Sequence, residues 1–396
     1  MRIVVSTPTF LPIVGGAELG IHEIYNRLGR KHDVTILTPC LPQELLDGYG
    51  AHDYASDHYK VHHIFPSLEH RLPYIARRAL KRTSFMYIAE LALAMRDGRP
   101  DVINFHFIRP HGGALLAMDR LYGVPTVLSL VGRSDVVELL APAERWYAEN
   151  VIKRADAVLP NSTYYLGSHR TDPPVKIIPY GVDTDVFSTG GGSDLRIRRQ
   201  LGLTDENFVL FSIQRLAPIK RVDALIRMMA KVVPRNPHVV LVIGGQGEED
   251  QELRRLAAEL HLQENVRFAG YIDSEQLPQY FASSNAFVFH SMLETFGIVF
   301  AQAMAASLPI VAANTSCVPD VLTSENGFLV EPFDTDAFAE AVLTLAGDRA
   351  LAREIGERNR AQAIREFDWD LIADQYERVL LDTVAQRRAG QAGRHG

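Results

Sequence analysis

Short apolar runs separated by amphipathic stretches recur along the whole chain. Runs that are apolar throughout and alternate with helical periodicity are typical of parallel strands covered on both faces. The pattern therefore predicts an α/β protein with two doubly wound, Rossmann-like sheets. The predicted strands are 3–6, 34–38, 101–105, 124–130, 155–160 and 175–179 in the first half, and 208–213, 239–243, 266–268, 286–289, 310–312 and 327–330 in the second.

A glycine-rich segment, 188–193, separates the two series of strands and indicates a domain boundary. We expect an N-terminal domain over 1–187, a linker region over 188–206 and a C-terminal domain over 207–369. An amphipathic helix follows at about 370–386. The tail 387–396 is basic, small and polar, a composition that predicts disorder.

Composition narrows the class of protein. The 396 residues, 47% hydrophobic and 22% charged, suffice for two α/β domains, and a net charge of −7 argues against a nucleic-acid binder. Cys40 and Cys317 lie far apart without metal-ligand spacing, which fits a reducing cytoplasm and no metal. The apolar run near the N-terminus is too short for a signal-peptide core, and none approaches the roughly 18 residues that span a bilayer.

A basic segment lies between the second and third predicted strands. Residues 70–89 contain no acidic side chain and mix arginine and lysine with large apolar residues. One interpretation is a peripheral membrane contact through 71–86, because basic amphipathic segments bind anionic lipid surfaces. The other is a solvated helix face.

Two strand ends in the first half carry candidate ligand-binding residues. Gly15 and Gly16 lie where a strand turns into a helix, and glycine there permits close backbone approach to an anion. His106 follows the strand 101–105, at the edge where α/β sheets bind ligands. A tight turn and a structural histidine are the plainer alternatives. The turn lacks G-x-G-x-x-G, which disfavours a dinucleotide-binding dehydrogenase.

The segment 286–305 holds the main candidate site. Glu294 precedes the pair Phe296 and Gly297, after which an apolar helix begins. Free N–H groups and the helix dipole attract phosphate at such a start, and a carboxylate beside it can hold hydroxyl groups. A sugar-phosphate site is therefore indicated, although Glu294 could also be a simple cap of the helix.

Two cations follow the strand 208–213. Arg215 and Lys220 suit a diphosphate, whose charge they would neutralise, although most such pairs are plain surface residues. The glycine loop 244–247 after the next strand leads into an acidic helix start. Those acids would repel phosphate, so this loop is interpreted as structural or near a sugar.

The segment 286–305 resembles retaining glycosyltransferases of family 4, whose signature is Glu, seven residues, Glu. Glu294 stands at the first position and Gln302 at the second. In the family the first Glu contacts the donor sugar hydroxyls and the second binds the nucleotide ribose. Gln keeps a hydrogen bond but loses the charge-assisted one, so the resemblance implies weaker nucleotide binding.

The resemblance also implies the GT-B architecture, in which two Rossmann-like domains face one another across a cleft and the final helix packs back on the first domain. Val131 replaces a histidine common in the family, and Tyr180 replaces an asparagine. The implied catalytic residues are Glu294 and His106. The implied donor-binding residues are Gly15, Gly16, Arg215, Lys220, Ile272 near the base, Phe296, Gly297, Ile298, Val299 and Gln302.

The activity that the resemblance implies is a retaining, metal-independent transfer of a sugar from a nucleoside-diphosphate sugar to a hydroxyl acceptor. The acceptor would be a glycan, a lipid-linked molecule or a small molecule, and no cofactor beyond the donor is expected. We expect a cytoplasmic protein, peripheral at the inner membrane face if 71–86 contacts lipid. Two alternatives remain: a sugar-nucleotide 2-epimerase, and a non-catalytic binder or partner subunit, for which Gln302 is the evidence.

Overall fold

The computed structural model describes residues 1–12, 15–39, 56–64, 87–88, 91–92, 95, 98–167, 173–188 and 195–392. The chain divides into two compact units. Unit 1 comprises Met1–Tyr180 and Trp369–Gly396, and unit 2 comprises Gly181–Asp368. The N-terminal part of unit 1 therefore ends seven residues before the expected domain boundary at 187. The expected linker contains the helix α8 (Leu195–Gln200), which belongs to unit 2.

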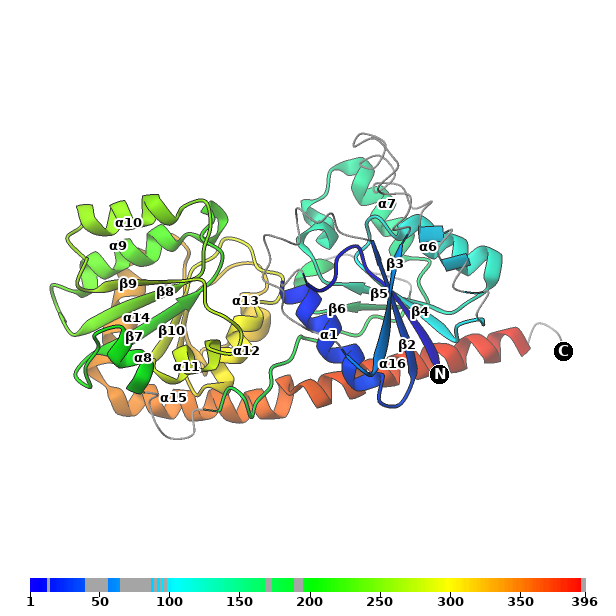
Figure 1. Cartoon of the computed structure of the whole chain (residues 1–396). Helices are drawn as coiled ribbons and strands as arrows, with labels where there is room; N and C mark the ends of the chain where they lie inside the picture. The colour runs from blue at the N-terminus through cyan, green and yellow to red at the C-terminus, as the bar shows by residue number, and fades with distance from the viewer. Residues whose placement is uncertain are drawn as a thin grey trace. The chain divides into compact units, whose positions relative to one another are not determined.

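Unit 1 is a parallel sheet in the order β3-β2-β1-β4-β5-β6, covered by helices on both faces (Figure 1). The helices α1 and α16 pack together on one face, and α6 and α7 lie on the other. The strands are β1 (Arg2–Ser6), β2 (Asp33–Pro39), β3 (Tyr59–Ile64), β4 (Val102–His106), β5 (Thr126–Leu130) and β6 (Ala157–Pro160), and the helices named are α1 (Gly16–Leu28), α6 (Gly112–Ala117), α7 (Pro142–Ile152) and α16 (Trp369–Ala392).

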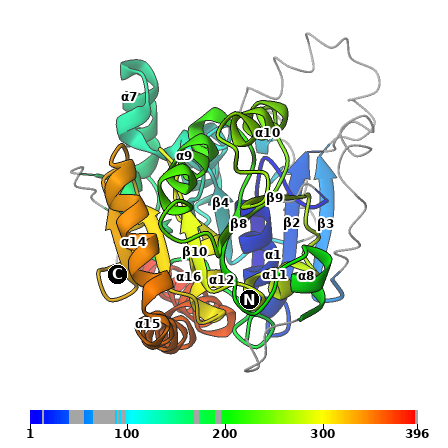
Figure 2. The same cartoon turned by 90° about the vertical axis from the view of Figure 1, so that its left-hand side faces the viewer.

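Unit 2 repeats this plan with the order β12-β11-β10-β7-β8-β9. Helix α9 packs against α10 and α14, and α15 packs against α12 and α14 (Figure 2). The strands are β7 (Phe208–Ile213), β8 (Val239–Gly244), β9 (Val266–Gly270), β10 (Ala286–Phe289), β11 (Ile310–Ala313) and β12 (Gly327–Val330). The helices are α9 (Val222–Val232), α10 (Asp250–Glu259), α11 (Leu277–Ala282), α12 (Ile298–Ala305), α13 (Val318–Val321), α14 (Thr335–Gly347) and α15 (Arg349–Gln362).

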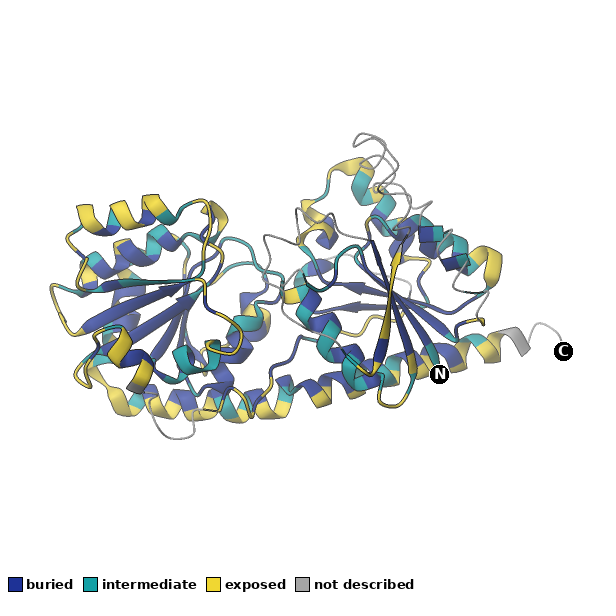
Figure 3. Ribbon diagram, viewed as in Figure 1, coloured by how far each residue is buried: buried dark blue, intermediate teal, exposed yellow. Residues whose placement is uncertain are grey.

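The burial pattern explains which strands the sequence reveals. Strands such as β4 and β8 are buried along their whole length, so their apolar runs are continuous (Figure 3). The edge strand β3, which exposes Lys60, Val61, His62 and His63, was not predicted from the sequence. An exposed edge strand needs no continuous apolar run, so the sequence pattern that predicts buried strands is absent from it.

Two expectations about unit 1 are corrected by the structure. The segment 175–179 is not a strand of the sheet, because only Val175 forms a bridge, to Val158. Residues 387–392 are helical instead of disordered, since α16 continues to Ala392. Arg387 forms ion pairs with Asp119 and Asp156, and Arg388 with Asp101, which holds this end of the helix on the unit.

Candidate active site

Each sheet has a point at which its strand order reverses, between β1 and β4 in unit 1 and between β7 and β10 in unit 2. Ligands of doubly wound proteins bind outside the carboxyl ends of strands at such a point. The candidate residues other than Ile272, which follows the edge strand β9, belong to the segments at these points. Gly15 and Gly16 follow β1, His106 ends β4, Arg215 and Lys220 follow β7, and Glu294 follows β10.

Lys220 and Glu294 form an ion pair in unit 2, between the Lys220 Nζ and the Glu294 Oε1. The two side chains are only 22% and 12% exposed, so water screens the pair less than a surface pair. The Lys220 Nζ also lies 5.9 Å from the ring centroid of Phe289. Met292 N–H donates to the Ile219 carbonyl at 2.9 Å, which ties the loops after β7 and β10 together. A cation and a carboxylate are thus held side by side at the switch point.

The loop after β11 supports Glu294 from the other side. The backbone N–H of Glu294 donates to Ser316 Oγ at 2.8 Å, and Thr315 Oγ1 donates to the Ser291 carbonyl at 2.7 Å. Ser316 and Thr315 were not predicted from the sequence. Nothing in the chain order marks them, because their role arises only when β11 lies beside β10.

Helix α12 begins directly after Gly297. This glycine has φ 73°, in the left-handed region, and a Cβ there would lie 2.7 Å from the Phe300 ring. The first turn carries no acidic side chain. Its N–H groups, at Ile298 and Val299, have no acceptor within the helix and carry the positive end of its dipole. The start of α12 is therefore suited to an anion.

Gln302 lies one turn further along α12 and is 7% exposed. Its Oε1 is buried and has no hydrogen-bond partner among the residues that the structure describes. A buried carbonyl left unpaired is costly, and such atoms often mark functional positions. Gln302 therefore offers an unused acceptor on the helix that begins at the candidate anion site.

Arg215 is not brought together with Lys220 and Glu294. Its side chain is 69% exposed and pairs with Glu248 at 3.1 Å. Nearby, the glycine loop after β8 packs tightly on the backbone of the β7 loop. A Cβ at Gly245, where φ is 113°, would lie 1.9 Å from the Gln214 carbonyl oxygen, and one at Gly247 would lie 2.2 Å from that of Leu216. Packing therefore requires glycine at both positions, whether or not a ligand binds at this loop.

The nucleotide-base role of Ile272 stays a prediction. Its side chain is 7% exposed and packs over Gly244, where a Cβ would lie 2.5 Å from Ile272 Cδ1. Phe296 is 2% exposed, and its ring makes an edge contact with Phe367 at 6.0 Å between centroids. Both side chains therefore help to hold the loops of unit 2 in place.

His106 in unit 1 is completely buried. Burial, and to a lesser degree the neighbouring His111, lowers the pKa of His106 to about 3, so the imidazole is neutral at pH 7. His111 Nδ1 donates to the main-chain oxygen of His106 at 2.9 Å, and burial lowers the pKa of His111 to about 4. His106 Nδ1 is buried without a hydrogen-bond partner in the described part of the chain.

Asp135 joins the loops that follow β4 and β5. Its carboxylate accepts from the N–H groups of Ile108 at 2.9 Å, Gly132 at 3.1 Å and Val131 at 3.2 Å. Burial raises the pKa of Asp135 to about 6 against the lowering effect of these hydrogen bonds. The backbone of Val131 thus serves to hold Asp135.

The chain matches two family models, Glycosyl transferases group 1 over residues 193–362 and Glycosyltransferase Family 4 over residues 14–186. A D-inositol 3-phosphate glycosyltransferase from Stackebrandtia nassauensis is 30% identical over 322 residues, which cover 75% of this chain and 71% of that protein. The chain belongs to the family 4 glycosyltransferases. The predicted family is confirmed.

Two further similarities extend over nearly the whole glycosyltransferase. The N-acetyl-alpha-D-glucosaminyl L-malate synthase of Bacillus anthracis is 26% identical over 396 residues, covering 97% of this chain and 98% of that protein. The crystal structure of Anabaena HepE in complex with UDP matches with a TM-score of 0.76 at 23% identity, covering 96% of this chain and 100% of that one. Together with the two parallel sheets, this confirms the predicted GT-B fold of two Rossmann-like domains.

The glycine turn of this glycosyltransferase is close to a carboxylate. Glu18 is 8% exposed and accepts from Thr9 Oγ1 at 2.5 Å. A Cβ at Gly15 would lie 2.5 Å from Glu18 Oε2, whereas one at Gly16 would meet no atom of the described residues within 4 Å. The Glu18 carboxylate would thus be close to an anion at Gly15. The diphosphate role of Gly15 and Gly16 stays a prediction.

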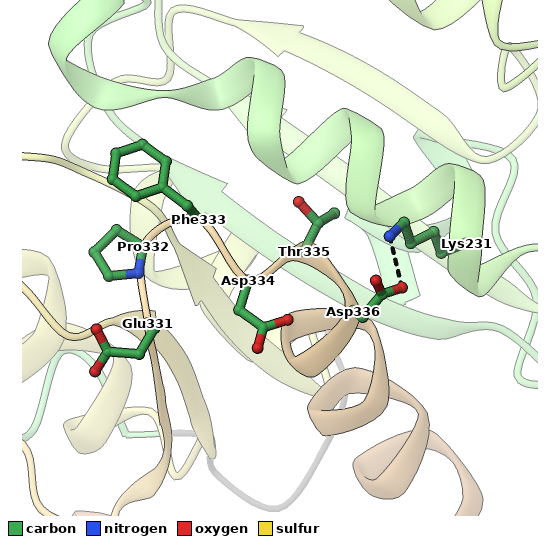
Figure 4. A pocket seen from close by; sticks show the side chains of 7 residues that line it. All are labelled: Lys231, Glu331, Pro332, Phe333, Asp334, Thr335 and Asp336. Atoms are coloured by element: carbon green, nitrogen blue, oxygen red, sulfur yellow. Dashed lines mark hydrogen bonds and ion pairs between the residues drawn. The ribbon is translucent and has the colours of Figure 1, made fainter.

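A pocket of about 430 Å³ lies elsewhere in unit 2 of the glycosyltransferase, at the start of α14 (Figure 4). Lys231 Nζ is paired there with Asp336 at 2.6 Å. None of the predicted site residues line it, and carboxylates outnumber cations in its wall, which does not suit a diphosphate. The lining residues are Lys231, Glu331, Pro332, Phe333, Asp334, Thr335 and Asp336.

The basic segment 71–86 lies outside the described residues, so its membrane contact stays a prediction. In the ranges that are described, no helix is long and apolar enough to cross a bilayer. Nor do three or more His, Cys, Asp or Glu side chains gather there in a group that could hold a metal ion.

Proposed function

We propose that this glycosyltransferase moves a sugar from a nucleoside-diphosphate sugar to a hydroxyl acceptor with retention of anomeric configuration. The observation that carries the proposal is the Lys220–Glu294 ion pair at the switch point of unit 2. The pair combines the two chemistries that a sugar diphosphate needs, a cation for phosphate oxygens and a carboxylate for sugar hydroxyls. The stability of the fold does not require such an ion pair beside a helix start that is capped by glycine.

In this proposal the donor separates the two members of the pair. Lys220 contacts the diphosphate, and the N–H groups at the start of α12 take up further charge. Glu294 accepts hydrogen bonds from the sugar hydroxyls. Gln302 accepts one from the ribose through its unpaired Oε1. Arg215 would leave Glu248, to which its exposed side chain is paired, and reach the diphosphate.

The chemical step breaks the bond between the anomeric carbon and the diphosphate oxygen and forms a bond to the acceptor oxygen on the same face. The acceptor proton passes to the departing phosphate oxygen. Lys220 and the helix N–H groups stabilise the negative charge as it develops, which accounts for a reaction without a metal ion. No cofactor beyond the donor enters this scheme.

The acceptor class is proposed more broadly, as a glycan, a lipid-linked molecule or a small molecule with a free hydroxyl. Related enzymes differ in the acceptor that their names record, an inositol phosphate in one case and malate in another. The cytoplasmic location and the peripheral membrane contact stay predictions.

A thermal-shift panel tests the donor part of the proposal. Nucleoside diphosphates and their sugars are added to the purified full chain with and without magnesium. A ligand at about a hundred times its dissociation constant stabilises by roughly 2.7 kcal/mol, which the assay resolves. We expect one nucleotide series to raise the melting temperature equally with and without magnesium. A shift that requires magnesium would contradict the metal-independent scheme.

Turnover separates the proposal from its alternatives. Product formed with the matching acceptor shows by its anomeric proton coupling whether configuration is retained. Binding without turnover across an acceptor library would favour the non-catalytic binder, for which Gln302 in place of Glu is the specific observation. Conversion of the donor sugar into its epimer in the absence of an acceptor would favour the 2-epimerase.

A further inference from the structure

The main chain of Glu294 lies between the end of β10 and the start of α12, so neither a strand nor a helix orders it. Its N–H group donates to Ser316 Oγ at 2.8 Å. Ser316 belongs to the loop between β11 and α13. A side-chain hydroxyl thus fixes the main chain of the residue whose carboxylate pairs with Lys220.

Ser316 itself has a strained main chain. Its φ is 45°, in the left-handed region. A Cβ makes this conformation unfavourable, whereas glycine adopts it freely. Such conformations persist only where the surrounding structure holds them, and they gather at functional sites. A serine at this position therefore indicates that its side chain has a role that glycine could not fill.

The loop is anchored on both sides of this serine. Asn314 N–H donates to the Val330 carbonyl, on β12, at 2.8 Å. Thr315 Oγ1 donates to the Ser291 carbonyl, in the loop after β10, at 2.7 Å. Val318 N–H donates to the Thr315 carbonyl at 2.9 Å, which forms the turn into α13. With these anchors in place, the left-handed turn directs the serine hydroxyl at the loop that carries the carboxylate.

We infer that Ser316 is a positioning residue, whose left-handed main chain aims Oγ at the Glu294 N–H and keeps the carboxylate at the switch point when Lys220 turns to the diphosphate. The ion pair cannot do this, because the bound donor separates its two members. The inference rests on the proposed function, which gives Glu294 its contact with the sugar hydroxyls. All three residues belong to unit 2.

Two substitutions separate the hydrogen bond from the strain. Ser316→Gly removes the hydroxyl but suits the left-handed main chain, so the melting temperature should stay within about 2 °C of the wild type. Its kcat should fall roughly 3–10-fold, because one neutral hydrogen bond that positions the carboxylate is lost.

Ser316→Thr has the opposite effects. It keeps the hydroxyl, but a β-branched residue is disfavoured at this φ. The melting temperature should therefore fall by several degrees while kcat stays closer to the wild-type value than in Ser316→Gly. If kcat instead follows the melting temperature in both variants, Ser316 has only a structural role and the inference is wrong.

Ser307→Gly is the matched control. Ser307 also has a left-handed main chain in unit 2, with φ 56°, and its N–H donates to the Met304 carbonyl at 3.0 Å. It follows the end of α12, whereas Glu294 precedes the start. The substitution relieves the same kind of strain, so kcat should not change. A similar fall of kcat in both glycine variants would overturn the role of the Ser316 hydroxyl.

Amide hydrogen exchange tests the contact without any substrate. The exchange rate of the Glu294 amide is resolved by mass spectrometry with electron-transfer fragmentation. It should rise severalfold in Ser316→Gly, because the N–H loses its acceptor, and should keep the wild-type value in Ser316→Thr and Ser307→Gly. An unchanged rate in a folded Ser316→Gly protein would overturn the inference.

Ligand binding separates the inference from the proposed function. Ser316→Gly should leave the Kd of the nucleoside diphosphate unchanged or lower it, because Lys220 keeps its charge while Glu294 is held less firmly. If the wild type transfers sugar and Ser316→Gly keeps full kcat, the inference alone fails. If the exchange rates are as expected but the wild type binds no nucleotide sugar, the proposed function fails, and Ser316 holds Glu294 for a different ligand.

Discussion

The two switch points of the molecule have the same topology but differ in the charge of the side chains that follow their strands. In unit 2, Lys220 and Glu294 are charged and partly exposed. In unit 1, His106 and His111 are fully buried, and burial lowers the pKa of both, so they are neutral at pH 7. The same strand order therefore supports a charged pair in unit 2 and, in unit 1, a neutral site formed by His106 and His111 near the carboxylates of Glu18 and Asp135.

This difference matches two tasks in sugar transfer. Charge that develops on a leaving diphosphate calls for cations and helix N–H groups, as in unit 2. Buried neutral side chains supply no such charge, but their hydrogen bonds hold strand ends in fixed orientations, as in unit 1. Changes to the charged site should therefore act on catalysis and anion binding, and changes to the neutral site should act on orientation and pH response.

Glu294→Gln should have the largest effect. It removes a charge that the sugar hydroxyls need in the transition state, so kcat should fall by about 10²–10³-fold. Binding of the diphosphate without sugar should be unchanged or tighter, because Lys220 loses its competing partner. Glu340→Gln is the control, since Glu340 forms an exposed ion pair with Arg235 in the same unit. A folded Glu294→Gln enzyme with near wild-type turnover would remove Glu294 from the mechanism.

Acid should destabilise the neutral site. The pKa values of His106 and His111, lowered to about 3 and 4, mean that only the unfolded chain takes up their protons as pH falls below about 6.5. Each contributes stability above that pH and loses about 2 kcal/mol of it by pH 5. Asp135, with a pKa raised to about 6, acts in the opposite sense and returns about 1 kcal/mol between pH 6 and 5.

Tryptophan fluorescence measures this effect in unit 1, because Trp146 and Trp369, the 2 tryptophans of the chain, both belong to it. Urea unfolding should show a net loss of about 2 kcal/mol between pH 6.5 and 5. His111→Asn should reduce the loss, since the amide can still donate to the His106 carbonyl but does not titrate. His238→Asn, at an exposed position in unit 2, should leave the loss unchanged. Equal pH dependence in all three proteins would show that His111 is not a cause.

Lys220→Ala should weaken nucleoside diphosphate binding. A charge-assisted hydrogen bond contributes about 1.5–3 kcal/mol, or roughly 10–150-fold in Kd. The loss should lie toward the lower end, because the donor must first displace Glu294 from Lys220. Titration calorimetry with the nucleotide found by the thermal panel measures it, with Arg235→Ala as the control. Equal Kd values for Lys220→Ala and the wild type would refute the phosphate role.

The elements of the fold were visible in the sequence wherever burial makes a strand apolar throughout, as in β4 and β8. The edge strand β3 and the last residues of α16 were not, because an exposed edge and long-range ion pairs leave no local pattern. Within the site, Lys220 and Glu294 were predicted from their places at strand ends. Their pairing with each other, and that of Arg215 with Glu248, depended on side-chain directions that spacing does not determine.

The buried network of unit 1 was missed for a different reason. Asn104 and Ser129 lie inside otherwise apolar strands, and Tyr25 lies on the buried face of α1. Each of them fits a core position in a hydrophobic pattern. Only the adjacency of β4, β5 and α1 brings their polar atoms together, so single segments of the sequence do not reveal the chain of hydrogen bonds from Ser129 through Asn104 and Tyr25 to His106.

Gln302→Glu should have the smallest effect and is the most specific test of the charged site. Gln302 has an unpaired, buried Oε1 on α12, so a carboxylate there gains charge-assisted bonds only when a ribose is present. Without nucleotide the buried charge is penalised, and the melting temperature should fall. With nucleotide the Kd should improve about 3–10-fold, a gain of roughly 1 kcal/mol.

The two halves of this prediction must occur together. A lower melting temperature without tighter binding would mean that Gln302 Oε1 faces no ribose and that the pocket is built differently from that of the family. Gln251→Glu, on the exposed face of α10, adds the same charge to unit 2 and should change neither quantity. If it does, the net charge of the unit, and not the position on α12, governs nucleotide binding. Nucleotide binding would then depend on the charge of the whole surface of unit 2 and not on the charges at its switch point.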